Sequence, residues 1–288
     1  MEQTFLPHRI VVVHKPDHEA ATMLAREMAQ WFAVRGCQCG VQAGSGGDIL
    51  RERPELVVVL GGDGTMLGVA RKLAAAPGPL VGVNFGKVGF LAELHVGNWQ
   101  EGLSCILEGH CRLLRRLALR WAVLREGARL HEGLVVNDVV LSRGALSRVI
   151  SLNISADSRH ICRVRADGLI LSTPTGSSGY AVSAGGPLVH PELQALTITP
   201  ICPFLCNFPP MVLPMPMRVS VEVMSDAVET FLTLDGQESV ALAPGDVVEV
   251  SGEPDRVFYA RIGEATYFRR LKARGFIEEY AGPPLQGV

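Results

Sequence analysis

The sequence predicts an α/β fold in two domains: an N-terminal α/β domain on a parallel sheet and a C-terminal, mainly antiparallel β-sandwich domain. In the first part of the chain, apolar β-branched runs alternate with segments of helical periodicity, as in βα units that cover a parallel sheet. From about residue 117, short β-type runs follow one another with turn residues between them, which is typical of an antiparallel sandwich. We therefore predict domains at 1–115 and 116–265, and a tail at 266–288 that packs back on the first domain.

The elements of the first domain follow from apolar spacing and from the residues that interrupt it. The first helix, for example, carries Leu24, Met28 and Phe32 at helical spacing and ends at Gly36. We expect strands at 10–13, near 41, 56–60 and 80–83, and helices at 19–36, 66–76 and 99–107.

The second domain is predicted almost entirely from short runs of β-forming residues. Between two of these runs, Asp235 and Gly236 form a turn signal of the kind found in hairpins. The tail is basic and amphipathic enough for a final helix at 266–276. Strands are expected at 119–124, 134–141, 149–156, 160–164, 169–172, 219–224, 230–234 and 247–250.

Composition and charge exclude several classes of protein. The 288 residues are 48% hydrophobic and 19% charged, and the net charge of −2 offers no electrostatic basis for binding nucleic acid or an anionic membrane. No apolar run approaches the roughly 18 residues of a spanning helix, and residues 1–10 are not expected to form a secretory signal. Seven scattered cysteines then indicate thiols in a reducing cytoplasm, without a structural metal site.

One glycine-rich loop carries the first functional signal. An apolar run leads into Gly61, Gly62, Asp63, Gly64 and Thr65, and helical spacing follows. Glycines let the backbone approach a phosphate, and the N–H groups and positive dipole end of the following helix attract its charge. The Asp63 carboxylate would repel phosphate oxygens unless a divalent cation or a hydroxyl lay between them. The loop therefore indicates phosphoryl transfer rather than phosphate binding alone.

Two commoner phosphate motifs do not fit the sequence. A Walker loop would need glycine at Val81 and a hydroxyl residue at Val88, on either side of Gly86 and Lys87. A dinucleotide motif would need its third glycine at Leu67. An ordinary strand-to-helix turn remains the alternative interpretation of the glycine-rich loop.

Two further polar stretches interrupt the β-rich half. Residues 167–180 combine hydroxyl and glycine residues, which suit a backbone that passes close to a ligand, although a mobile surface loop is the alternative. Asn137 and Asp138 lie within an apolar run, where a buried amide and carboxylate need partners. A ribose with two hydroxyls and a base edge would supply them, and a turn at a strand end is the alternative.

Together, and in this order, the three motifs resemble those of the NAD kinase family, which has a Gly-Gly-Asp-Gly loop, an Asn-Glu pair and a Thr-Pro-Thr-Gly-Ser-Thr-Ala-Tyr stretch. The resemblance extends over residues 10–276 and includes residues 82–91 and 235–237. It implies an α/β domain and a β-sandwich domain that meet at the site. It also implies transfer of the γ-phosphoryl group of ATP, or of polyphosphate, to the 2′-hydroxyl of the adenosine ribose of NAD. Members of the family are usually homo-oligomers.

The resemblance also assigns roles to residues. Asp63 matches the catalytic aspartate, which can orient the acceptor hydroxyl and take its proton. Magnesium would accompany ATP, with waters and phosphate oxygens as most of its ligands, so no protein metal ligand is predicted. The positions matched to the phosphates of ATP are Gly61, Gly62, Gly64 and Thr65. The positions matched to NAD binding are Phe85, Asn137, Asp138, Arg165, Asp167, Ser178, Gly179, Tyr180 and Ser183.

The sequence departs from the family pattern at four places. Asp138 replaces a glutamate and is one methylene shorter, and Ser178 with Gly179 replaces Thr-Ala. Phe204 stands where the family commonly has histidine, and Pro209 where it often has arginine. The last two departures remove polar contacts near the second nucleotide or a subunit interface.

Two other functions remain as alternatives. A lipid or sphingoid-base kinase of the same loop class would need a deep apolar pocket, whereas the stretch at 167–180 is polar. A nucleotide-sensing homologue without activity would explain the four departures but not the presence of Asp63.

Overall fold

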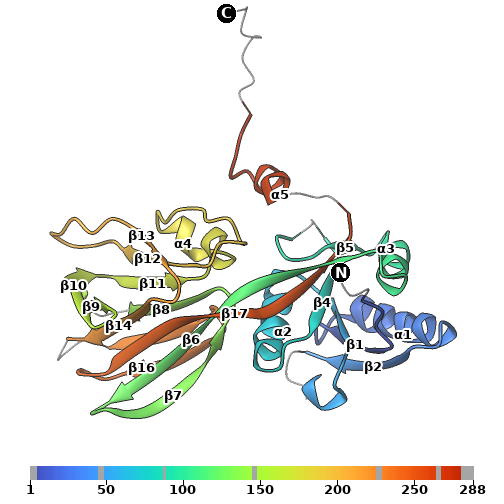
Figure 1. The fold of residues 1–288 in the computed structure, drawn as a ribbon, viewed down its shortest axis with the longest axis horizontal. Helices are drawn as coiled ribbons and strands as arrows, with labels where there is room; N and C mark the ends of the chain where they lie inside the picture. The colour runs from blue at the N-terminus through green and yellow to red at the C-terminus, as the bar shows by residue number, and fades with distance from the viewer. Residues whose placement is uncertain are drawn as a thin grey trace, which may run out of the picture.

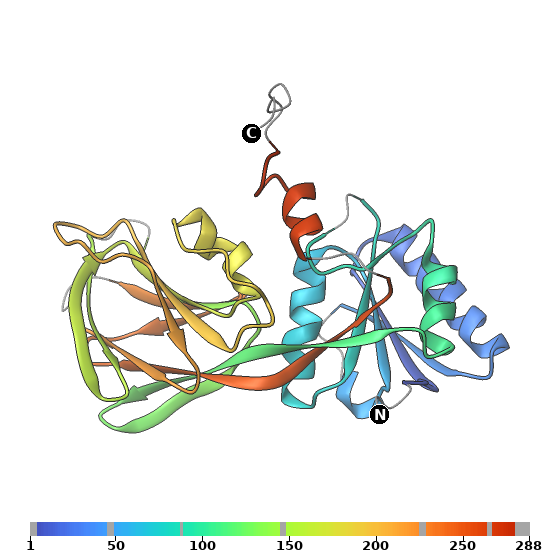
Figure 2. The ribbon, with the colours of Figure 1, turned by 45° about the horizontal axis from the view of Figure 1, so that its top comes forward.

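The computed structural model describes residues 5–44, 49–86, 89–144, 148–224, 229–263 and 267–279. Two lobes lie side by side, as Figure 1 and Figure 2 show: an α/β lobe made by residues 5–111, and a β lobe made by most of the residues that follow. Two long strands run from the β lobe into the α/β lobe, so one sheet extends through both. The predicted combination of a parallel α/β domain and an antiparallel β domain is confirmed.

The α/β lobe is built on parallel strands in the order β2-β1-β3-β4, with the short β5 paired to the end of β4. In chain order the elements of this lobe are β1 (Arg9–His14), α1 (Glu19–Val34), β2 (Gln38–Ala43), the 3₁₀ helix η1 (Ile49–Glu52), β3 (Leu56–Leu60), α2 (Asp63–Ala75), β4 (Pro79–Asn84), β5 (Leu94–His95) and α3 (Trp99–Leu107).

Helices cover both faces of this parallel sheet because its strands are apolar on both faces. In β1, Ile10 and Val12 point toward α1 and α3, whereas Val11 and Val13 point toward α2. The buried residues of α1 recur at intervals of three or four and are Ala21, Ala25, Met28 and Phe32. The carboxyl ends of β3 and β4 are thereby fixed at one edge of the sheet, where the glycine-rich loop begins.

The β lobe contains two packed sheets. In chain order its strands are β6 (Arg112–Arg125), β7 (Ala128–Val135), β8 (Asp138–Arg143), β9 (Ile150–Ala156), β10 (Arg159–Ala166), β11 (Gly168–Ser172), β12 (Ala195–Ile201), β13 (Met211–Pro214), β14 (Arg218–Val223), β15 (Thr230–Leu234), β16 (Glu238–Leu242) and β17 (Val247–Arg261). Its helices are η2 (Gly176–Ser178) and α4 (Tyr180–Ser183), and α5 (Tyr267–Ala273) ends the described chain.

The core of the β lobe lies between these two sheets. One sheet is antiparallel throughout, in the order β13-β12-β11-β8-β15-β16, and faces β10, β9, β14, β17, β6 and β7. Alternate residues of each strand point inward, as Leu117, Leu119, Trp121 and Val123 do from β6.

The two longest strands, β6 and β17, connect the lobes. They pair with each other along most of their length, with an irregularity between Glu253 and Val257. Beyond it, Phe258 and Tyr259 pair in parallel with the start of β4, so the last strand of the β lobe enters the sheet of the α/β lobe. The two lobes therefore share a backbone hydrogen-bond network rather than a flexible linker.

Several predicted elements differ from the structure. The run at 134–141 is two strands, because the backbone leaves β7 after Val135 and enters β8 at Asp138. The prediction missed β12, β13 and β16 and made β6 and β17 too short. Strand β6 passes through residue 115 without a break, so the domain limits remain a prediction. Of the predicted tail, residue 266 and residues 280–288 lie outside the described residues. No described helix is long and apolar enough to span a bilayer.

Candidate functional site

The glycine-rich loop connects β3 to α2 at the carboxyl edge of the parallel sheet. Gly62 caps α2 in an extended conformation, and Asp63 is the first helical residue. A Cβ on Gly61 would lie 2.7 Å from Thr65 Oγ1, so the close packing of Thr65 over the turn requires a glycine there. A Cβ on Gly62 or Gly64 would meet no protein atom within 4 Å. These two glycines therefore leave open space at the helix N-terminus, where an anion can bind.

The Asp63 carboxylate is held from two sides. Its Oδ2 accepts a hydrogen bond from the Phe90 amide at 2.8 Å, and its Oδ1 accepts one from the Leu91 amide at 3.1 Å. A Cβ on Gly89 would lie 2.0 Å from Asp63 Oδ1, so any other residue there would displace the carboxylate from this position. From the residue that follows α5, Arg274 Nη2 lies 3.3 Å from Oδ2. The carboxylate is thus fixed in position while more than a third of its side chain stays exposed.

Asp235 organises the second polar motif. This buried residue lies in the turn between β15 and β16, where its φ is 51°. Its carboxylate accepts hydrogen bonds from the amides of Val136, Asn137 and Asp138, the shortest of them 2.7 Å from Asn137. The break between β7 and β8 therefore takes its shape from a residue of another hairpin.

A cavity of about 370 Å³ opens at this break. Asp138 lies in its wall and is 6% exposed. Burial, together with the neighbouring Asp235 carboxylate, raises the pKa of Asp138 to about 7. The buried Oδ1 of Asn137 has no partner among the described residues. The residues that line the cavity are Asn137, Asp138, Val140, Ser142, Tyr180, Thr233, Asp235 and Gly236.

The hydroxyl-rich stretch forms an ordered wall beside this cavity. Buried Thr173 donates its hydroxyl to the Val136 carbonyl at 2.7 Å and accepts from the Gly176 amide at 2.9 Å. Ser177 accepts from the Val189 amide at 3.0 Å. Because a Cβ on Gly176 would lie 2.2 Å from the Asn137 carbonyl oxygen, the turn packs directly on the Asn-Asp motif. Tyr180, which follows it, is half exposed at the cavity.

The turn at 235–237 brings the two motifs together. Gln237 donates its side-chain amide to the Gly64 carbonyl at 2.8 Å, across the boundary between the lobes. Arg71 of α2 donates to the Leu234 carbonyl at 3.3 Å and forms an ion pair with Glu238. Asp63 and the cavity beside Asp138 therefore lie at one junction between α2 and the β lobe.

Other predicted site residues lie elsewhere. Phe85 packs in the α/β lobe, with its ring 4.9 Å from that of His18. Arg165 and Asp167 lie near the far ends of β10 and β11, where Arg143 forms an ion pair with Asp167 at 2.7 Å. In the register of the sheet, Gly168 pairs with Ser142 and Ser172 pairs with Asp138. Four residues of strand, or about 13 Å, thus separate the Asp167 end from Asp138, and Ser142, the partner of Gly168, lines the cavity at that end.

The last predicted positions lie on the short helices that follow the hydroxyl-rich stretch. Ser178 is partly buried and donates to the Thr175 carbonyl at 3.2 Å. Gly179 is exposed, and its backbone connects η2 with α4. Ser183 is exposed at the end of α4 and does not line the cavity. The structure thus brings Tyr180 to the cavity and leaves Ser183 outside its lining.

Comparison with known proteins agrees with this geometry. Residues 48–111 match the family described as ATP-NAD kinase N-terminal domain, and residues 136–259 match the family described as ATP-NAD kinase C-terminal domain. An NAD kinase of Nitratidesulfovibrio vulgaris (strain Miyazaki F) is 49% identical over 276 residues, which cover 94% of this chain and 98% of that protein. The chain belongs to the NAD kinase family. A second NAD kinase, of Oleidesulfovibrio alaskensis, is 46% identical and covers 95% of both chains.

Solved structures of the NAD kinase family share the fold. An NAD kinase of Archaeoglobus fulgidus in complex with ATP matches with a TM-score of 0.72 and 26% identity, over 92% of this chain and 98% of that one. Yeast NADH kinase complexed with NADH matches in fold with a TM-score of 0.82 and 23% identity, over 99% and 91%. The predicted NAD kinase is confirmed, and neither the lipid kinase nor the inactive homologue is supported.

The NAD kinase prediction did not include every residue that builds the junction. The sequence predicts Asp235 only as part of a turn, and Gln237 only as part of the resemblance. An acidic residue in a tight turn after an apolar strand is, however, a signal for a side-chain acceptor. Arg71 and Arg274 carry no local signal, because their partners lie far away in the sequence.

Proposed function

We propose that this chain transfers the γ-phosphoryl group of ATP to the 2′-hydroxyl of the adenosine ribose of NAD, with Asp63 as the catalytic base. The supporting observation is the junction at residues 235–237, which connects the Asp63 loop to the cavity beside Asp138 through the bond from Gln237 to Gly64. We call this cavity, where NAD would bind, the acceptor cavity. The Asp63 carboxylate takes the hydroxyl proton as the hydroxyl oxygen attacks the γ-phosphorus and ADP leaves. The two backbone bonds to its oxygens leave lone pairs for this proton.

The acceptor end of the proposal rests on Asn137 and Asp138. The unpartnered Oδ1 of Asn137 is a buried acceptor that the amino group of adenine would satisfy. Above its raised pKa of about 7, the Asp138 carboxylate accepts hydrogen bonds from ribose hydroxyls, and below it the protonated group can donate one. Asp235 acts as a positioning residue, because it fixes the backbone of both side chains.

The donor end combines the open helix N-terminus with a divalent cation. Gly62 and Gly64 leave room for phosphates beside the first N–H groups of α2, and Gly61 and Thr65 shape the turn. The described residues contain no group of three or more His, Cys, Asp or Glu side chains that could hold a metal ion. On this proposal Mg²⁺ is held mainly by phosphates and water, near Asp63, and neutralises the charge of the triphosphate.

The central test is an Asp63→Asn variant. We expect it to bind NAD and ATP while kcat falls by roughly 10²–10⁴, because the amide cannot accept the proton. NADP formation from NAD, ATP and magnesium measures turnover, and calorimetric titration measures binding. Asp255→Asn, which changes an exposed carboxylate paired with Arg115, is the matched control and should keep wild-type turnover. Near-normal turnover of Asp63→Asn would contradict the role of Asp63.

We also propose that the working protein is a homo-oligomer. The family resemblance implies such an assembly, and Arg165 and Asp167, which match NAD-binding positions, lie about four strand residues beyond Asp138. Exposed Phe204 and Leu205 beside Arg165 offer an apolar surface for such a contact. Sedimentation of the wild-type chain measures the assembly, and a monomer at assay concentration would contradict it.

The remaining assignments are proposals of the same kind. The seven cysteine thiols are all free, which supports a reducing, cytoplasmic location.

We keep the predicted division into units at 1–115, 116–265 and 266–288, because the Asp63 loop and the Asn137-Asp138 motif lie on opposite sides of the first limit. Arg270 and Arg274, which contact Phe90 and Asp63, support a tail that packs on the first unit.

A further inference from the structure

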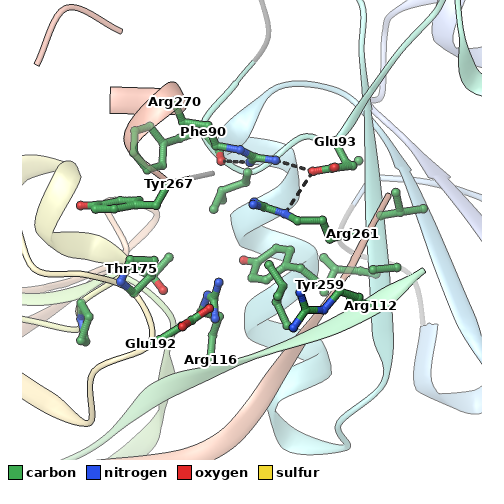
Figure 3. Close-up of a pocket in the computed structure, with 18 of the residues that line it drawn as sticks. Phe90, Glu93, Arg112, Arg116, Thr175, Glu192, Tyr259, Arg261, Tyr267 and Arg270 are labelled. Carbon is green, nitrogen blue, oxygen red and sulfur yellow. Dashed lines mark hydrogen bonds and ion pairs between the residues drawn. The ribbon is translucent and has the colours of Figure 1, made fainter. Parts of the chain in front are cut away.

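A second cavity, of about 360 Å³, lies between the two lobes and below α5. Figure 3 shows that its walls come from β4, the start of β6, the end of β17 and α5. The charged side chains that line it are Arg112, Arg116, Arg261, Arg270, Glu93 and Glu192. None of these six residues belongs to the acceptor cavity beside Asp138. We call this second cavity the arginine cavity.

The arginine cavity carries an excess of positive charge. Four guanidinium groups face two carboxylates, and Glu93 is shared by Arg270 and Arg261, the latter at 3.6 Å. Arg116 is only 8% exposed; its burial lowers the pKa of the guanidinium, and the nearby Glu192 carboxylate offsets part of this effect. A buried cation is costly unless an anion compensates it, so these walls favour an anionic ligand.

A buried hydroxyl supplies an independent indication. Tyr259 is 8% exposed, and its hydroxyl oxygen has no hydrogen-bond partner among the described residues. Figure 3 shows the ring projecting between Arg116 and Arg261 in the wall of the cavity. A buried hydroxyl without a partner costs free energy, and a ligand with acceptor oxygens would remove that cost.

The arginine cavity adjoins the proposed catalytic base. Phe90 and Leu91 line it, and the amides of these two residues hold the Asp63 carboxylate. On the opposite wall, Thr175 belongs to the turn that packs on Asn137. The cavity and the acceptor cavity therefore lie on two sides of one polar junction.

We propose that the arginine cavity binds the phosphate chain of the phosphoryl donor, with Arg112, Arg116 and the Tyr259 hydroxyl in contact with its oxygens. This site rests on the proposed kinase function and extends it. The end of the chain reaches the loop at residues 61–65, and the remaining phosphates lie over the arginines. A nucleoside triphosphate and inorganic polyphosphate both contain a chain of linked phosphates. In either donor, several anionic oxygens of this chain can accept hydrogen bonds from guanidinium groups.

Strand β6 offers matched variants for a test. Arg112, Leu114 and Arg116 occupy alternate positions of β6, so all three face the cavity. Arg115 points to the other face and forms an ion pair with Asp255 at 3.4 Å. Arg112→Gln and Arg116→Gln therefore remove charge from the cavity, and Arg115→Gln removes the same charge from outside it. Tyr259→Phe removes only the unpartnered hydroxyl.

The first measurement is steady-state kinetics with ATP or inorganic polyphosphate as donor, each with magnesium. Removing one charge-assisted contact should raise the KM for the donor about tenfold in Arg112→Gln and Arg116→Gln, with the KM for NAD changed less than about twofold. Arg115→Gln should behave as wild type. An unchanged donor KM in Arg112→Gln and Tyr259→Phe, or an equal rise in the KM for NAD, would overturn the proposal. The donor whose KM responds identifies the source of the phosphate chain.

The second measurement is binding of tripolyphosphate with magnesium, followed by thermal shift. Without ligand, Tyr259→Phe should melt at or above the wild-type temperature, because it loses a hydroxyl that has no partner. With ligand, its stabilisation should be smaller than that of wild type. Equal stabilisation of both would count against the site. If wild type binds tripolyphosphate through these arginines yet does not phosphorylate NAD, the proposed function fails while the anion site stands.

Discussion

Two neighbouring buried carboxyl groups, those of Asp138 and Asp235, determine the charge of the acceptor cavity. Asp235 accepts three backbone N–H bonds, which favour its ionised form, whereas Asp138 has no such set of donors in the part of the chain that the structure describes. Burial and the charge of Asp235 therefore raise the pKa of Asp138, to about 7. The folded protein binds a proton at Asp138 at pH values where the unfolded chain does not.

This difference predicts a pH dependence of stability that an Asp138→Asn variant lacks. Between the ordinary carboxyl pKa of 3.8 and about 7, rising pH ionises Asp138 only in the unfolded chain, so wild-type stability falls relative to the variant. Between pH 5 and pH 7 we expect the difference in unfolding free energy to change by about 2–3 kcal/mol in favour of the variant. Urea unfolding at several pH values measures it, and parallel curves would contradict the raised pKa.

At the scale of the element, the turn between β11 and η2 joins the hydroxyl-rich stretch to the Asn-Asp motif. Thr173 makes this connection, since its buried hydroxyl bonds to Val136 of one segment and to Gly176 of the other. The sheet register adds to it, because Ser172 pairs with Asp138. The positions on η2 and α4 that are predicted to bind NAD are thus placed by hydrogen bonds within the protein.

A Thr173→Val variant tests this arrangement. Because the variant leaves a buried carbonyl and a buried amide without partners, we expect a loss of about 1–3 kcal/mol of stability and a higher KM for NAD. Thr199→Val is the matched control, since the hydroxyl of Thr199 is equally buried but has no partner among the described residues. That control should be as stable as wild type or more so. Denaturant unfolding measures the stability of both variants. If both lose the same amount of stability, the loss comes from replacing threonine by valine and not from the hydrogen bonds of Thr173.

At the scale of the whole molecule, the two lobes are joined by strands rather than by a linker. Strands β6 and β17 take part in the core of the sandwich and in the sheet of the α/β lobe. Arg71 and Gln237 add polar contacts between α2 and the β lobe. A hinge motion between the lobes would have to bend these two strands, so the site is largely preformed.

We expect the protein to unfold in one cooperative transition. Neither lobe keeps a complete sheet if the other one melts, because β17 would lose its partners on one side. Scanning calorimetry should show a single peak whose calorimetric and van't Hoff enthalpies agree, and NAD should shift that whole peak upward. Two peaks, of which NAD shifts only one, would show that the lobes unfold independently.

The sequence by itself determined the features that depend on neighbours along the chain. Helical spacing in residues 19–34 and the apolar run at 56–60 encode α1 and β3 locally, and the glycines at 61–64 encode the tight turn into α2. The order of three motifs was enough to predict the family. These signals need no knowledge of the fold, because backbone conformation and amphipathicity are properties of short segments.

Only the tertiary structure decided which distant groups meet. Asp235 accepts from Asn137 across 98 positions of sequence, and this contact ends β7 where the apolar pattern predicted one continuous strand. The length of β17 and the charge of the arginine cavity likewise depend on strands and helices that converge from both lobes. Apolar periodicity records that a residue is buried but not against what, and hydrogen bonds and charges act on the groups that folding brings close.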